Sequence, residues 1–149
     1  IINIITVRLV DKVNLMESKV QHMLDEYYKE LNVTPNYNSR LQHQVKPRAA
    51  MMVAMTKEMS VTGVARSFNM NHATVLHHSR KHLDNLQHWD GYKENYKLAA
   101  SLCDVWLKRE KIETAISRVN NRIKRLQGVA EQLNQRLKNE QLQVQNNEH

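Results

Sequence analysis

The sequence predicts an all-α protein, with a compact helical domain followed by a long coiled-coil helix. Its 149 residues are 41% hydrophobic and 25% charged, which is ordinary for a folded chain. Three glycines, two prolines and an aromatic content of 5% are low for a sheet protein, whose turns use Gly and Pro and whose strands favour aromatic residues. In addition, apolar residues recur at helical spacing along most of the chain.

The first amphipathic helix is predicted over residues 14–31, and it stops before Thr34-Pro35-Asn36. Residues 1–10 have the apolar content of a signal-peptide core but lack its basic flank and small residues, and residues 1–13 stand as a separate segment without an assigned role. The apolar positions of the helix fall three and four residues apart: Val13, Met16, Val20, Met23, Leu24, Tyr27, Tyr28 and Leu31.

A polar, basic loop is predicted over residues 38–47, and Pro47 suits the first turn of the helix that follows it. The methionines of that helix are interpreted as core packing, not as cofactor ligands. Its predicted core stripe consists of Ala50, Met51, Ala54, Met55 and Met59.

Two short helices joined by a tight turn come next. Ser60 can cap a third helix that directs Val61, Val64 and Phe68 inward, and the turn 69–71 leads into a helix over 72–86. Two such helices on a basic scaffold are typical of the helix-turn-helix motif, whose second helix enters the DNA major groove.

The helix over 72–86 carries the candidate DNA-contacting residues. At 100° per residue its inward face is Val75, Ser79, Leu83 and Leu86, and Asn71 occupies the N-cap. In a major groove Asn pairs with adenine, a Thr methyl meets the thymine methyl, and His exchanges one hydrogen bond, while basic residues further along meet phosphates. The outward residues are Ala73, Thr74, His77, Arg80 and Lys81.

Charge supports a polyanion as partner. Residues 36–83 hold seven Lys or Arg against Glu58 alone, a net +6 of the chain's formal +7. A solvated basic face is the alternative. A metal site at His78 and His82, spaced i, i+4, is a second alternative, but no Cys, Asp or Glu stands close enough in sequence to complete it, so neither metal nor cofactor is expected.

A coiled coil is predicted from Leu98 to Val144, followed by a frayed polar tail to residue 149, and a chain ending at Lys97 is expected to fold by itself. Arg109 and Glu140 are the breaks in the heptads, and Gly128 lies near the weak middle. Such a helix needs a second copy or a different chain as partner, and the pattern leans toward two parallel strands. The a positions are Ile116, Ile123, Ala130, Leu137 and Val144, and the d positions are Ile112, Val119, Leu126 and Leu133.

Compartment and chemistry are bounded by absences in the sequence. The single Cys103 cannot form an internal disulfide, and no apolar run approaches the roughly 20 residues that span a bilayer, so a cytoplasmic protein without membrane contact is expected. No nucleophile-base pair, carboxylate dyad or phosphate loop is recognisable, so neither an enzyme nor a small-molecule substrate is expected.

Residues 20–96 resemble the C-terminal DNA-binding domain of the bacterial replication initiator DnaA. Asn71-His-Ala-Thr-Val-Leu-His77 followed by Arg80-Lys81 is similar to the family's most diagnostic stretch, usually Asp-His-Thr-Thr-Val. Arg40, eight residues before Arg48, stands where the family has its minor-groove arginine, and Lys46-Pro-Arg48 resembles the start of its long second helix.

The resemblance implies a DnaA-like helix-turn-helix domain over residues 14–97 that binds double-stranded DNA. Arg40 would enter the minor groove, and Asn71, His72, Ala73 and Thr74 would occupy the major-groove positions. Asn69-Met70 replaces the family's Gly-Gly turn, Asn71 its Asp, and Ala73 its first Thr, so the site read is expected to differ from the family's. The expected DNA-binding set is Arg40, Lys46, Arg48, Asn71, His72, Ala73, Thr74, His77, Arg80 and Lys81.

The initiator's ATPase is not expected, since no Gly-x4-Gly-Lys phosphate cradle occurs in the sequence. A regulator or replication accessory factor of the bacterial nucleoid is therefore the first hypothesis. The second is a structural or packaging protein of a phage or mobile element, which would use the same fold and the coiled coil for assembly.

Overall fold

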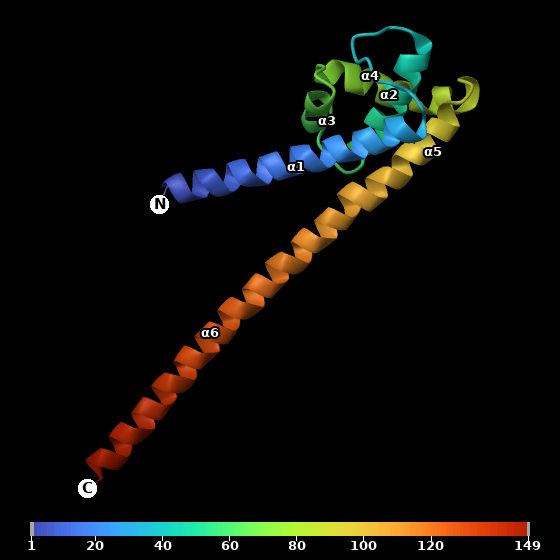
Figure 1. Cartoon of the computed structure of the whole chain (residues 1–149). Coiled ribbons are helices and arrows are strands. Elements are labelled where there is room, and N and C mark those ends of the chain that lie inside the picture. Colours follow the sequence, from blue (N-terminus) through green and yellow to red (C-terminus); the bar gives the residue numbers. More distant parts are fainter. Residues whose placement is uncertain (1, 149) are drawn as a thin grey trace. The chain divides into compact units, whose positions relative to one another are not determined.

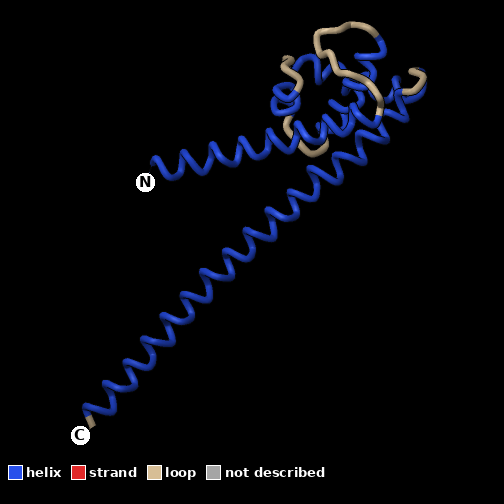
Figure 2. The backbone as a smooth tube through the Cα atoms, in the orientation of Figure 1, coloured by secondary structure: helices blue, strands red, loops and turns tan. Residues whose placement is uncertain are grey.

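The computed structural model describes the backbone of residues 2–148 and the side chains of residue 11 and residues 14–148 (Figure 1). The prediction of an all-α chain is confirmed: over residues 2–148 every regular element is a helix (Figure 2). The elements are α1 (Ile2–Glu30), α2 (Gln42–Thr56), α3 (Val61–Ser67), α4 (His72–His88), α5 (Tyr92–Cys103), the π-helix η1 (Asp104–Lys108) and α6 (Arg109–Asn147).

The chain divides into two compact units after Arg109, not after Lys97 as the sequence predicts. The apolar residues just beyond Lys97 belong to the core of the first unit, since Ala99, Leu102 and Leu107 are all buried. The second half of α5 and η1 therefore complete the domain. Of the predicted coiled coil, only the residues after Arg109 lie outside this domain.

The core of the first unit is built around α2, which packs on α3, α4 and α5. Every residue from Pro47 to Met55 is buried, so α2 has no solvent face over that stretch. From α1, Met23, Leu24 and Tyr27 enter the same core, and the Tyr27 hydroxyl donates to the Pro47 carbonyl at 2.8 Å. The methionines of α2 are core residues, as predicted.

Two predicted helix starts are wrong. Residues 1–13 are not a separate segment, because α1 begins at Ile2 and runs unbroken to Glu30. The polar loop is shorter than predicted, because α2 begins at Gln42 and encloses Pro47. A proline inside a helix lacks the N–H that would bond four residues back, which removes one backbone hydrogen bond from α2.

Asparagine ends two of the helices. Asn69 has φ 52°, Met70 N–H donates to the Ala65 carbonyl at 2.9 Å and Asn69 N–H to that of Arg66 at 3.1 Å. Asn32 at the end of α1 repeats this pattern with φ 53°. This is the Schellman arrangement, in which glycine is commonest and Asn is the next choice because it tolerates a left-handed backbone. Asn69 thus makes a tight turn without glycine.

The second unit is the body of α6, a helix with no buried residue. Its large apolar side chains are about half exposed or more, from Ile123 at 47% to Leu126 at 60%. A helix in a protein gains most of its stability by packing its apolar face against other elements. This unit has no such packing, whereas the first unit does. None of the described helices is both long and apolar enough to cross a membrane.

Candidate nucleic-acid interface

The α3–turn–α4 segment forms the predicted pair of helices, and α3 packs directly on α4. Ser60 caps α3 as predicted, since its hydroxyl accepts from the Gly63 N–H at 3.1 Å. Val64 and Phe68 are buried, which fixes α3 on the core. The start of α4 is therefore held by the Asn69 turn and by the packing of α3.

The N-terminus of α4 is capped by Asn71, also as predicted. Its side-chain Oδ1 accepts from the Thr74 N–H at 3.0 Å and from the Thr74 hydroxyl at 3.1 Å. These hydrogen bonds use the side-chain oxygen of Asn71 and the hydroxyl proton of Thr74. The Asn71 amide nitrogen can still donate, and the Thr74 oxygen and methyl can still accept a hydrogen bond or pack against a base.

The residues predicted to face outward do lie on the surface. His72, Ala73, His77, Arg80 and Lys81 are exposed and Thr74 is half-exposed. They follow one side of α4 from its N-cap toward its middle. This arrangement leaves the positive end of the helix dipole and two cationic side chains open to an anionic partner.

The inner face of α4 differs from the prediction at Leu83, which is 74% exposed. The buried stripe runs through Val75, His78, His82 and Leu86, all buried or half-buried. These four residues are spaced three, four and four positions apart, so they lie on one face of the helix. Leu83 lies eight positions after Val75, which at 100° per residue places it on a different face. Two histidines therefore take the place expected of aliphatic residues.

Burial shapes the chemistry of both histidines. Desolvation lowers the pKa of His78 to about 4, with smaller contributions from His77 and Arg48. Desolvation also lowers the pKa of His82, whose Nδ1 lies 2.8 Å from the Tyr92 hydroxyl and whose ring lies 4.3 Å from that of Tyr96. Neutral His82 thus lies between α4 and α5, whereas His78 is half-buried on the side of α4 that is near Arg48 of α2.

The geometry does not favour the metal alternative at His78 and His82. Among residues whose side chains are described, no three His, Cys, Asp or Glu residues gather around a common point. His82 spends one ring nitrogen on Tyr92, and structural metal sites are built from four ligands. Helix packing accounts for both histidines.

Arg48 has a different role from the predicted DNA contact. It is only 6% exposed; its Nη1 donates to the Tyr37 carbonyl at 3.0 Å and its Nη2 to the Ser39 carbonyl at 3.1 Å. Desolvation lowers its pKa. A buried guanidinium needs such acceptors, so Arg48 serves to pin the loop between α1 and α2.

The same loop carries Arg40, which is exposed. Gln44 also holds the loop, since its amide donates to the Thr34 carbonyl at 2.9 Å and accepts from the Asn36 N–H at 2.8 Å. Arg40 therefore projects from a loop fixed by α2. Arg48, which holds this loop, also lies close enough to His78 to lower the pKa of that residue, so the loop borders the flank of α4.

Lys46 lies at the far end of α4 from the Asn71 cap. Its ammonium sits 5.8 Å from the centre of the Trp89 ring, and that ring stacks on Tyr92. A cation over an indole is held by the ring's negative face. Lys46 is half-exposed and is thus placed as a charge beside the end of α4, away from the candidate base-reading residues.

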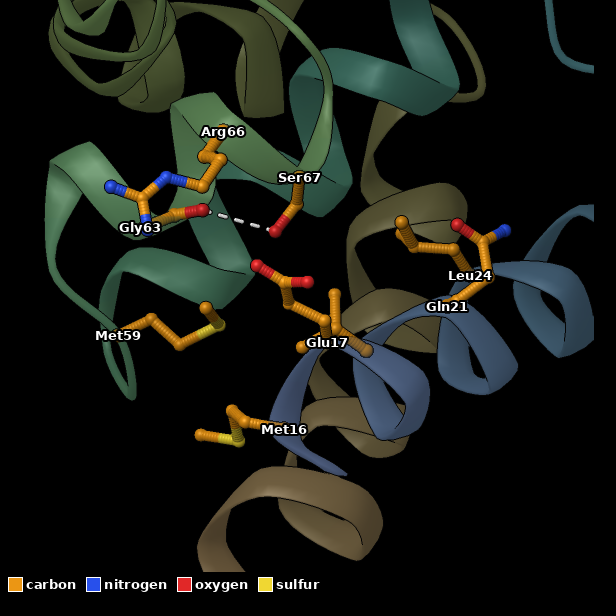
Figure 3. A pocket seen from close by; sticks show the side chains of 9 residues that line it. Met16, Glu17, Gln21, Leu24, Met59, Gly63, Arg66 and Ser67 are labelled. Carbon is orange, nitrogen blue, oxygen red and sulfur yellow. Dashed lines mark hydrogen bonds between the residues drawn. The ribbon is translucent and has the colours of Figure 1, made fainter. Parts of the chain in front are cut away.

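Arg66 is a further candidate that the sequence does not assign. It is exposed in the last turn of α3, the helix that crosses the DNA backbone in this motif. Arg66 and Ser67 line a hollow whose other wall comes from α1 and includes Met16 and Glu17 (Figure 3). The Ser67 hydroxyl donates to the Gly63 carbonyl at 3.0 Å, so its proton serves the helix backbone.

Comparison with family models, with curated proteins and with solved structures finds no match to this chain. The case for a function therefore depends on the residues and their geometry.

Proposed function

We propose that this protein binds double-stranded DNA through α4 without catalysing a reaction. The observation that carries the proposal is the N-terminus of α4. Asn71 and Thr74 there form a hydrogen-bonded cap, and each keeps a group that can still hydrogen-bond to a base. His72 and Ala73 are exposed beside them. A helix with this tip fits end-on into a major groove.

The charge of the surrounding surface supports the same partner. Arg48 is buried, but the other Lys and Arg residues between 36 and 83 are exposed or half-exposed. In a DNA complex, Arg80 and Lys81 would neutralise phosphates next to the base-reading tip, Arg66 would do so from the last turn of α3, and Lys46 would do so beside the far end of α4. Exposed cations alone would suit any polyanion, so the capped tip is what favours duplex DNA.

The resemblance to the DnaA domain suggests a second DNA contact, in the minor groove. Arg40, on a loop pinned by Arg48 and Gln44, would enter the minor groove beside the site read by α4. A pre-fixed loop reduces the entropy lost when the arginine inserts. We propose a regulator or replication accessory factor of the bacterial nucleoid as the biological role.

A structural or packaging protein of a phage or mobile element is the second candidate. The observation in its favour is α6, whose apolar stripe is exposed over the described part of the helix and suits assembly. Such a protein would bind DNA with little sequence preference. Selection of bound sequences from random duplexes separates the candidates, because a sharp motif supports the regulator and salt-sensitive binding without preference supports the packaging protein.

Two substitutions test whether α4 reads bases. Thr74→Val keeps the shape and methyl but removes the hydroxyl, so preference should relax at one base position. Lys81→Ala should weaken all sequences alike and reduce the salt slope by about one unit. Lys93→Ala, an exposed lysine on α5, is the matched control and should change neither. Uniform loss of affinity in both α4 variants would show that this helix makes no direct readout.

Arg40→Ala tests the minor-groove contact. The loss should be roughly 1–3 kcal/mol of binding free energy, the range of a specific base contact. It should be largest on sites with a narrow A/T-rich minor groove, where the negative potential is strongest. Competition between duplexes with A/T-rich and G/C-rich flanks measures this difference, and equal loss on both would make Arg40 a phosphate contact.

A further inference from the structure

The hydrogen bonds of the Asn71 side chain leave it with donors alone. Its Oδ1 accepts from the Thr74 N–H at 3.0 Å and from the Thr74 hydroxyl at 3.1 Å. An amide oxygen has two lone pairs, and these two hydrogen bonds use both of them. Asn71 is exposed, so what its side chain offers to a partner is an NH2 group with two N–H donors.

The orientation of this amide is fixed by its partners. The Thr74 backbone N–H is a donor and cannot accept a hydrogen bond. A half-turn of the Asn71 amide would therefore set its NH2 group against that N–H, with two donors facing each other. It would also remove the hydrogen bond by which an N-cap residue stabilises its helix. The NH2 group is thus held on the side of the amide away from Thr74.

Thr74 is left with the opposite capacity. The Asn71 Oδ1 cannot donate, so the hydroxyl proton of Thr74 lies between the two oxygens. The Thr74 oxygen keeps a lone pair that can accept, and the residue is half-exposed. Ala73, which lies between them in the sequence, has no hydrogen-bonding group in its side chain. Two donors and one acceptor are therefore available from these three residues.

We propose that Asn71 selects guanine in the DNA major groove and determines the base preference at one position of the bound site. The inference rests on the proposed binding of α4 to double-stranded DNA, and it adds which base this side chain reads.

Guanine is the base whose major-groove edge matches two donors. Its N7 and O6 are both acceptors, so both N–H bonds of Asn71 face an acceptor. The cytosine paired with it presents an amino group in the same groove, and the Thr74 oxygen can accept from that group. One G·C pair therefore satisfies both donors of Asn71 and the acceptor of Thr74.

The other three bases leave a donor of Asn71 unpaired. Adenine presents its N6 amino group beside N7, which sets one donor against another. Cytosine presents an amino donor, and thymine presents one acceptor beside its methyl group. The usual bidentate pairing of Asn with adenine needs the amide oxygen to accept from N6. In the capped side chain that oxygen is already occupied.

Asn71→Asp inverts the hydrogen-bonding capacity of this side chain without changing its size. One carboxylate oxygen can take over the cap, since Asp is as good an N-cap residue as Asn, so α4 should fold as before. The other oxygen accepts and cannot donate, so it should favour the amino groups of cytosine and adenine. The melting temperature in circular dichroism should not fall, which separates a change in base reading from a loss of structure.

Selection of bound sequences from random duplexes compares the full-length wild type with this variant. The wild-type motif should contain one position where guanine is preferred over adenine by roughly 5- to 150-fold, the range of one well-paired base contact. In Asn71→Asp the preferred base at that position should change to cytosine or adenine. The other positions of the motif should keep their preferred bases.

Asn69→Asp is the matched control. It adds the same negative charge two residues earlier, at an exposed asparagine of the turn, and Asp also tolerates the left-handed backbone there. The added charge should weaken binding to all duplexes alike, because the phosphates carry the same charge in every sequence. The motif selected by this variant should equal that of the wild type.

A modified base tests the contact atom. Replacement of the selected guanine by 7-deazaguanine removes the N7 acceptor and keeps base pairing with cytosine. This replacement should weaken binding of the wild type and should not change binding of Asn71→Asp, whose side chain makes no hydrogen bond to N7. An equal loss in both proteins would assign the N7 contact to another residue and overturn the inference.

Three results of the selection would overturn the inference and leave DNA binding in place. The first is a motif that is unchanged in Asn71→Asp or changes in the same way in Asn69→Asp. The second is a base other than guanine at the position that Asn71→Asp alters. The third is binding without base preference, which would also favour the packaging protein over the regulator. Failure of the wild type to bind any duplex would instead overturn the proposed function, and this inference with it.

Discussion

The two units of this chain are both helical, but they differ in how far their helices are buried. Residues 47–55 of α2 are buried without exception, whereas α6 has no buried residue along its 39 positions. Residues 49–55 of α2 are apolar without interruption, whereas α6 carries apolar residues three and four positions apart among polar ones. A helix that is apolar on every side is buried in a core, and α2 packs on α3, α4 and α5 while the body of α6 forms a unit by itself.

The two units therefore differ in what stabilises them and in what they can do. The first unit can hold a fixed surface such as the α4 tip, since its core is complete. The second has no buried residue, so we expect it to need a partner for a stable structure, and pairing with a second copy would make its folding dependent on protein concentration. Mutations in the two units should therefore have effects of different kinds.

The largest expected effect comes from moving the boundary between the units. A chain ending at Lys97 loses Leu102, Cys103 and Leu107 from the core, and large buried side chains contribute about 2–5 kcal/mol each. That loss matches the entire stability of a small domain, so this chain should be unfolded. A chain ending at Arg109 is the control and should melt cooperatively as a monomer in circular dichroism. A cooperative melt of the shorter chain would place the boundary back at Lys97.

The next effect compares one leucine in each unit. Leu107→Ala, at a side chain 1% exposed, should cost about 2–5 kcal/mol of unfolding free energy at any protein concentration. Leu126→Ala, at 60% exposure, should leave the first unit unchanged and weaken only association. Tryptophan fluorescence follows the first unit selectively, since Trp89 and Trp106 both lie within it.

Urea titration at two protein concentrations completes this test. The Leu107→Ala midpoint, followed by fluorescence, should shift equally at both concentrations. For Leu126→Ala only the helical signal should depend on concentration. A shift of the fluorescence midpoint by Leu126→Ala would mean that α6 contributes to the core of the first unit.

Local features of the site could be predicted from sequence, because they depend on residues close in the chain. The caps at Ser60 and Asn71 each join a side chain to a backbone N–H three residues on, and both are confirmed. Exposure of His77, Arg80 and Lys81 follows from helical spacing relative to buried Val75. The all-α fold likewise follows from composition and period.

Long-range features could not be predicted. The seven-residue pattern from Leu98 onward continues across the unit boundary, so the sequence does not show that Leu102 is buried in the core while Ile112 is 55% exposed. In the sequence Arg48 cannot be told from the other basic residues, because only the fold brings the Tyr37 and Ser39 carbonyls to it. His78 is a polar residue in the sequence, although it is half-buried in the fold and desolvation lowers its pKa.

The smallest expected effect concerns acid stability, and it separates the units because His149, the last residue, is the one histidine in the sequence after residue 109. The pKa of His78 is about 4 in the folded chain, below its ordinary value of 6.5. As pH falls from 6.5 toward 4, the unfolded chain therefore takes up a proton that the folded chain does not. The contribution of neutral His78 is complete above pH 6.5 and is lost over that interval.

His78→Leu should therefore flatten the acid loss of stability measured by urea titration with tryptophan fluorescence at pH 7 and pH 5. His82, whose pKa is also lowered by burial, acts in the same direction and should leave part of the loss in place. His43→Gln, at an exposed histidine on α2, is the control and should keep the wild-type difference between the two pH values. If His78→Leu kept that difference as well, the acid loss of stability would have to come from other groups of the first unit, and the role given to His78 would be wrong.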